Sequence, residues 1–169
     1  MLLWFKSVKD LDFRRLMSVY EEGNLENAAD RYPNLPPLQG IMQAEQDFYQ
    51  FLREIFFPTE GAVYAVWEEN REYISALRLE PYRDGLLLSA LETAPQYRHR
   101  GYAKRLITAV FENLPEAKVY SHVSKRNVAS LRTHISCGFR KISDHATYLD
   151  GSVLTSSCTL CRRSQGATL

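Results

Sequence analysis

A short segment of this 169-residue chain brings together two arginines, a histidine and a glycine: Arg98-His99-Arg100-Gly101-Tyr102-Ala103. A run of strand character ends at Pro95, and a helical pattern is under way by residue 103. The segment should therefore form the turn that leads into the first turn of a helix. Backbone N–H groups at such a place lack intrahelical acceptors and carry partial positive charge, so phosphates bind there readily.

The residue types in this turn suit a diphosphate. Gly101 removes a side chain where a diphosphate would approach the backbone closely, and Ala103 keeps a neighbouring position small. Positive charge at the rim comes from Arg98, Arg100 and Lys104. A helix that simply begins with solvated basic residues fits this segment about as well, because short glycine patterns are weak signals. The chain has no GxxxxGKS/T and no GxGxxG pattern, which excludes a P-loop and a dinucleotide fingerprint.

Hydrophobic spacing along the chain predicts the elements that must position this turn. Helical spacing occurs once before and once after the proline-rich loop 33–37, and again over 103–114 and 128–137. Strand patterns cover residues 1–6, 62–67, 73–79, 86–91, 118–123, 139–148 and 153–160. The order β-α-α-β-β-β-α-β-α-β-β predicts an α/β fold, with one open, mixed, twisted sheet and helices on both faces. Residues 86–123 should form a right-handed parallel crossover.

Composition limits the kinds of protein this can be. The length is typical of one domain, spanning 1–169, and 21 Lys and Arg against 20 Asp and Glu leave a net charge of +1. This balance gives no reason to expect a nucleic-acid or membrane partner. No apolar run is long enough for a transmembrane helix, and the N-terminus lacks the features of a signal peptide. We therefore expect a cytoplasmic protein.

Two of the three cysteines, Cys158 and Cys161, have the CxxC spacing of a redox or zinc site. They fall in a strand pattern, however, and residues three apart on a strand point to opposite faces of the sheet. No second CxxC or HxxxH pair is present to complete a metal site. The sequence therefore predicts neither a metal centre nor a redox motif here.

Two motifs together resemble the GNAT acetyltransferase superfamily. Residues 91–103 resemble its central motif, which ends in Gln or Arg, two variable residues, Gly, one variable residue, and Gly or Ala. Arg98, Gly101 and Ala103 match it. The pattern Asn127-x-x-Ser130-x-x-x-His134-x-x-x-Gly138-Phe139 resembles the second signature of the family. The resemblance covers residues 62–160 and implies the GNAT fold, in which the central parallel strands splay apart.

The resemblance also implies acetyl-CoA as co-substrate and assigns residues to it. Its pantetheine arm would enter the gap between the splayed strands and pair with backbone groups of Leu91 and Thr93. The diphosphate would be held by the turn that comprises Arg98, His99, Arg100, Gly101, Tyr102, Ala103 and Lys104. Asn127 and Ser130 would contact the cofactor from the other side of the gap. Asn127 is also a suitable N-cap for the following helix.

The implied reaction is direct transfer of acetyl to a primary amine of a small molecule or peptide. An alkyl ammonium has a pKa of about 10.4, so it must lose a proton before it attacks. Glu92 is the nearest carboxylate and our candidate base, with Glu80 or a water-mediated route as alternatives. Many relatives carry a tyrosine general acid where this chain has His134, which we name as candidate proton donor. A packing or hydrogen-bonding role for His134 is equally open.

Other functions remain compatible with the sequence. A non-catalytic acyl-CoA-binding or sensing module would need the same cofactor motif, and a plain interaction domain would need only the fold. The acceptor, the range of acyl groups and the choice between monomer and homodimer are not readable from the residues.

Overall fold

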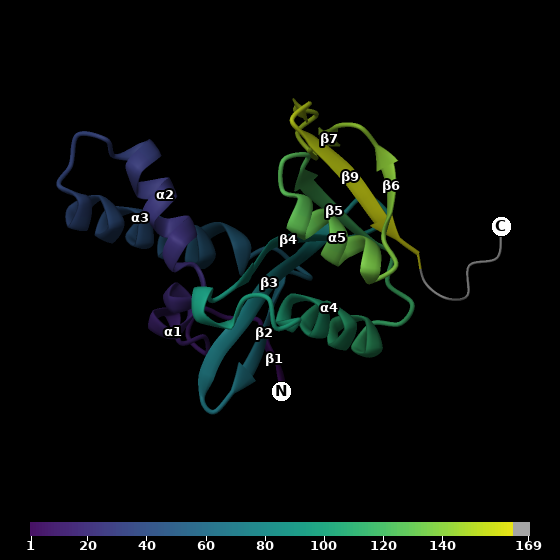
Figure 1. Ribbon diagram of the computed structural model, residues 1–169, viewed down its shortest axis with the longest axis horizontal. Helices are drawn as coiled ribbons and strands as arrows, with labels where there is room; N and C mark the ends of the chain where they lie inside the picture. The colour runs from purple at the N-terminus through teal and green to yellow at the C-terminus, as the bar shows by residue number, and fades with distance from the viewer. Residues whose placement is uncertain (164–169) are drawn as a thin grey trace.

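The computed structural model describes residues 1–163 and contains a seven-stranded sheet with the order β1-β2-β3-β4-β5-β9-β6 (Figure 1). Its strands are β1 (Leu2–Phe5), β2 (Val63–Glu69), β3 (Glu72–Tyr82), β4 (Gly85–Thr93), β5 (Val119–Ser124), β6 (Arg140–Ser143) and β9 (Ser157–Arg162). β7 (Ala146–Thr147) and β8 (Val153–Leu154) form a separate small hairpin. All neighbouring strands of the large sheet are antiparallel except β4 and β5, which are parallel. The predicted mixed sheet is confirmed.

The strands place apolar side chains alternately on the two faces of the sheet, and helices cover both faces. The helical elements are α1 (Phe13–Val19), α2 (Glu21–Arg31), α3 (Pro37–Phe51), the π-helical turn η1 (Leu52–Phe56), the 3-10 turn η2 (Pro95–Tyr97), α4 (Tyr102–Asn113) and α5 (Val128–Ser136). On β2, Ala65 belongs to the core under α4, whereas Tyr64 and Val66 belong to the core under α1 and η1. The α2–α3 pair projects from the body of the protein (Figure 1).

The helical region before β2 differs from the prediction. Two helices are expected, but α1 and α2 are separate because the chain breaks at Tyr20 (φ −98°, ψ 15°). The Tyr20 hydroxyl donates to the Ala90 carbonyl (2.6 Å) and accepts from the Tyr64 hydroxyl (2.7 Å). These partners lie far away in the sequence, so a local hydrophobic period cannot anticipate the break.

The C-terminal strands also differ from the prediction. Residues 139–148 and 153–160 are expected to form two long strands, but each is interrupted. The register of β6 against β9 shifts between Lys141 and Ser143, and the chain leaves the large sheet after Ser143 and resumes as β7. The Thr159 hydroxyl donates to the His145 carbonyl (2.8 Å), a side-chain bond that replaces ladder pairing at this point.

The parallel pair β4–β5 parts soon after it begins, which confirms the expected splay. Pairing runs only from Leu86 opposite Val119 to Leu88 opposite Ser121, although both strands continue beyond it. A bulge accompanies the separation: two steps along β3, from 76 to 78, match three steps along β4, from 89 to 92. Ala90, at the bulge, has a φ of 50°. The bulge bends β4 locally, as an extra unpaired residue does.

Cys158 packs in the core under α4 and Cys161 in a small cluster with Tyr82, so the two thiols do lie on opposite faces. All three cysteines are free. Among the described residues, no group of three or more His, Cys, Asp or Glu side chains could hold a metal ion. No helix within residues 1–163 is both long and apolar enough to cross a membrane.

Candidate active site

A cleft of about 560 Å³ opens where β4 and β5 part. Its walls come from the start of α2, the end of β4, the turn before α4, and the first turns of α4 and α5. The lining residues are Glu22, Gly23, Glu26, Leu91, Glu92, Thr93, Tyr97, Arg98, His99, Gly101, Tyr102, Ala103, Lys104, Asn127, Ala129, Ser130 and Thr133. Most residues assigned to the cofactor from the sequence therefore line one cleft, although they come from separate elements.

The turn before α4 presents free backbone N–H groups to this cleft. Gly101 has a φ of +80° and is the residue that precedes the helix. The N–H of Arg105 donates to the Gly101 carbonyl (3.0 Å), and this bond is the first of the helix. The amides of Tyr102, Ala103 and Lys104 consequently have no intrahelical acceptor, which makes the helix start suitable for an anion.

Gly101 borders open space at the start of α4. A Cβ built on Gly101 would meet no atom within 4 Å. His99 in the same turn also has a left-handed backbone (φ 61°), which is uncommon for a residue with a side chain. Two left-handed residues within three positions turn the chain sharply between β4 and α4.

The side chains of the turn point in several directions. The Tyr102 hydroxyl donates to Glu69 (2.8 Å), so this residue offers the cleft its backbone and not its phenol group. The Arg100 guanidinium lies over the Tyr97 ring at 5.7 Å, and Arg100 is absent from the cleft lining. His99 and Lys104 line the cleft.

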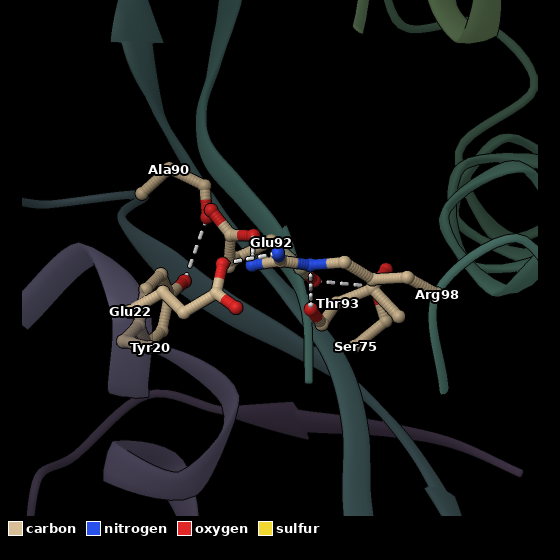
Figure 2. A network of polar contacts seen from close by, with 7 residues as sticks. All are labelled: Tyr20, Glu22, Ser75, Ala90, Glu92, Thr93 and Arg98. Carbon is tan, nitrogen blue, oxygen red and sulfur yellow. Dashed lines mark hydrogen bonds and ion pairs between the residues drawn. The ribbon is translucent and has the colours of Figure 1, made fainter. Parts of the chain in front are cut away.

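The Arg98 side chain joins three acceptors beside the cleft (Figure 2). Its Nε donates to the Thr93 carbonyl (3.1 Å), its Nη2 to Glu92 Oε1 (3.0 Å), and its Nη1 to the Glu22 carboxylate. Glu92 is half-buried, and burial raises the pKa of its carboxyl group, while the Arg98 charge opposes that rise. The cleft therefore contains a carboxylate whose pKa is shifted toward neutrality.

Hydrogen bonds to β3 hold the end of β4 in place. The Ser75 hydroxyl donates to the Glu92 carbonyl (2.6 Å) and lies 3.0 Å from the Thr93 hydroxyl (Figure 2). The Ala94 N–H donates to the Ile74 carbonyl (2.9 Å). Leu91 lies in the bulge and has no partner on β3, whereas the alternation of backbone groups directs those of Thr93 away from β3, where its carbonyl accepts from Arg98 Nε.

The start of α5 forms the opposite wall. The Asn127 side chain accepts from the Ser130 N–H (3.0 Å), so Asn127 is an N-cap and also a cleft residue. His134 lies one turn further on and is only 1% exposed. Its Nδ1 is 2.8 Å from the Ser130 carbonyl and its ring packs edge-on against Phe139. His134 is not part of the cleft lining, so its assignment as proton donor stays a prediction.

Several cleft residues carry no sequence signal. Glu22, Gly23 and Glu26 belong to the first turns of α2, and only tertiary packing brings them to the end of β4. Tyr97, Ala129 and Thr133 are neighbours of motif residues but are not specified by the motifs. The alternative base Glu80 lies elsewhere, with the Ser89 hydroxyl 3.5 Å from its carboxylate.

The structure combines a mixed sheet whose parallel pair splays apart with a helix start whose free amides lie beside the cleft. The model of the acetyltransferase (GNAT) family matches residues 25–139, which is more than half of the chain. The protein belongs to this family. No curated protein matches the sequence.

Solved structures share the fold at low sequence identity. The ribosomal-protein-S18-alanine N-acetyltransferase from Escherichia coli is 15% identical, with 99% of this chain and 97% of that chain covered and a TM-score of 0.63. The PaiA N-acetyltransferase from Thermoplasma acidophilum, solved in complex with coenzyme A, is 14% identical, with 96% and 99% covered and a TM-score of 0.61. A spermidine N-acetyltransferase SpeG chimera from Vibrio cholerae and hSSAT is 18% identical, with 96% and 95% covered and a TM-score of 0.60.

Proposed function

We propose that this protein transfers acetyl from acetyl-CoA to a primary amine of a small molecule or peptide. The observation that supports this most directly is the turn at Gly101. It presents three amides without intrahelical acceptors to a cleft between splayed strands. Family membership and the coenzyme A complex of one structural relative support the same assignment.

The residues present fit the cofactor in this proposal. The amides of Tyr102, Ala103 and Lys104 would hold the diphosphate, with the Lys104 ammonium nearby. The Leu91 backbone and the Thr93 N–H would pair with the pantetheine arm, as an added strand pairs with a sheet edge, while the Thr93 carbonyl accepts from Arg98 Nε. When bound, acetyl-CoA supplies the thioester that the amine attacks.

In this proposal Glu92 is the general base. It lines the cleft, and burial raises its pKa, so its carboxylate binds a proton more readily than an exposed one does. Glu92 accepts a proton from the ammonium group of the acceptor. The amine nitrogen then bonds to the acetyl carbon, the carbon–sulfur bond breaks, and the second proton of the nitrogen ends on the coenzyme A sulfur.

Activity tests this proposal directly. With acetyl-CoA and a broad panel of primary amines, thiol release should exceed the buffer rate for at least one amine. Glu92→Gln should reduce that rate without changing the affinity for coenzyme A. If no amine in the panel releases thiol, acetyl transfer is refuted.

The second candidate is an acyl-CoA-binding or sensing module without turnover. One observation favours it: His134, which replaces the family's tyrosine, has a buried ring outside the cleft lining. Binding of acetyl-CoA in calorimetry without thiol release would support this module. Absence of any thermal shift with acetyl-CoA would instead leave only an interaction domain.

A further inference from the structure

Arg98 belongs to the motif that the family uses for the cofactor, yet all three of its guanidinium nitrogens donate to groups of the protein (Figure 2). The acceptors are the Thr93 carbonyl on β4, Glu92 on β4 and Glu22 on α2. A guanidinium is planar and holds its donors in a fixed fork, so acceptors in three directions determine its orientation. The side chain is one-third exposed and sits in the wall of the cleft.

Lys104 differs from Arg98 in this respect. It lines the same cleft, on the first turn of α4, and no salt bridge or side-chain hydrogen bond to it occurs within the described part of the chain. Its amide is also one of those without an intrahelical acceptor. The Lys104 ammonium could therefore bind a diphosphate without losing a contact to the protein. Arg98 would first have to release two carboxylates.

We propose that Arg98 is a positioning residue for Glu92 and not a ligand of the diphosphate. Glu22 of α2 competes with Glu92 for the positive charge of Arg98. This inference rests on the proposed function, in which Glu92 is the base. One guanidinium serves two carboxylates from different elements. The start of α2 thereby influences how strongly Arg98 stabilises the ionised form of Glu92.

The charged and titratable groups that face Glu92 come from three places. Arg98 approaches from the turn before α4, Glu22 from α2, and Tyr20 lies where α1 meets α2. The neighbouring positive charge of Arg98 lowers the pKa of Glu92, and the negative charge of Glu22 raises it. Loss of Arg98 and loss of Glu22 should therefore shift the Glu92 titration in opposite directions.

The test compares Arg98→Gln, Glu22→Gln and Lys104→Gln in the full chain. Calorimetry measures the affinity for coenzyme A, and carbon-13 NMR follows the Glu92 carboxyl titration without cofactor, assigned by its loss in Glu92→Gln. Arg98→Gln should raise the Glu92 titration midpoint and move the acidic limb of kcat to higher pH. Glu22→Gln should lower both.

Affinity separates the two roles. Lys104→Gln should weaken coenzyme A binding at least about tenfold, as loss of a charge-assisted contact does, while Arg98→Gln changes it less than about threefold. Arg98→Lys keeps the positive charge but loses the planar fork of donors. Its Glu92 titration midpoint should therefore lie between those of the wild type and Arg98→Gln. This variant also controls for misfolding of Arg98→Gln.

The proposal is overturned if Arg98→Gln weakens coenzyme A binding as much as Lys104→Gln and leaves the Glu92 midpoint unmoved. Failure of the proposed function would look different. A wild-type protein that binds coenzyme A but releases no thiol would refute acetyl transfer, while the titration and the affinities would still decide the role of Arg98.

Discussion

Gly101→Val should abolish most cofactor binding while the protein remains folded. Gly101 has a φ of +80°, and a side chain added there would meet no protein atom within 4 Å. The Cβ of the substituted residue therefore causes no clash inside the protein. The substitution costs the strain of a left-handed backbone, about 1–2 kcal/mol, which a domain with about 5–15 kcal/mol of stability tolerates. For a chain of this length, that corresponds to a fall in Tm of about 2–8 °C.

The loss of binding should be much larger than this strain. A valine side chain would occupy the space in front of the free amides of α4, so a diphosphate could not approach them. Each hydrogen bond to a charged group contributes about 1.5–3 kcal/mol, and loss of two would weaken binding about 100-fold to 20,000-fold. Isothermal titration calorimetry with coenzyme A measures this change.

Gly151 offers a matched control. It has a φ of +85° in the turn of the β7–β8 hairpin, and a Cβ there would also meet nothing within 4 Å. Gly151→Val should therefore lose similar stability but keep wild-type affinity for coenzyme A. If Gly101→Val binds coenzyme A within about threefold of wild type, the Gly101 turn is not the diphosphate site.

Three further predictions concern the base, the pH dependence and the sheet. Glu92→Gln should lower kcat about 100-fold or more, as loss of a general base does, with the Kd of coenzyme A unchanged; an unaltered kcat would exclude Glu92. Burial lowers the pKa of His134, so the unfolded chain binds the imidazole proton more tightly than the folded chain does. Stability should therefore be complete above the ordinary pKa of 6.5 and fall as the pH drops below it. His134→Leu should flatten this decline in urea unfolding, and a slope identical to wild type would contradict it. Gly85→Ala would place a Cβ 2.2 Å from the Lys118 carbonyl oxygen, which accepts from the Leu86 N–H. The free energy of unfolding should fall by about 1–3 kcal/mol, and a wild-type Tm would refute that close approach.

Much of the fold was predictable because its signals are local. The helical period of α4 and the cap at Asn127 each depend on residues a few positions apart. The parallel crossover from β4 to β5 follows from the order strand, helix, strand. The break between α1 and α2 was not predictable from local spacing: it falls at Tyr20, whose hydroxyl donates to the Ala90 carbonyl, 70 residues away.

The same division applies to the site. The sequence alone determined the turn at Gly101, because free amides at a helix start and a glycine without steric limits are properties of neighbouring residues. It also brought Glu92 forward as the nearest carboxylate. Only the tertiary structure decided that Arg98 is held between Glu92 and Glu22, a residue 76 positions away, and that His134 is buried. Side-chain partners across such distances depend on how whole elements pack, which no local spacing records.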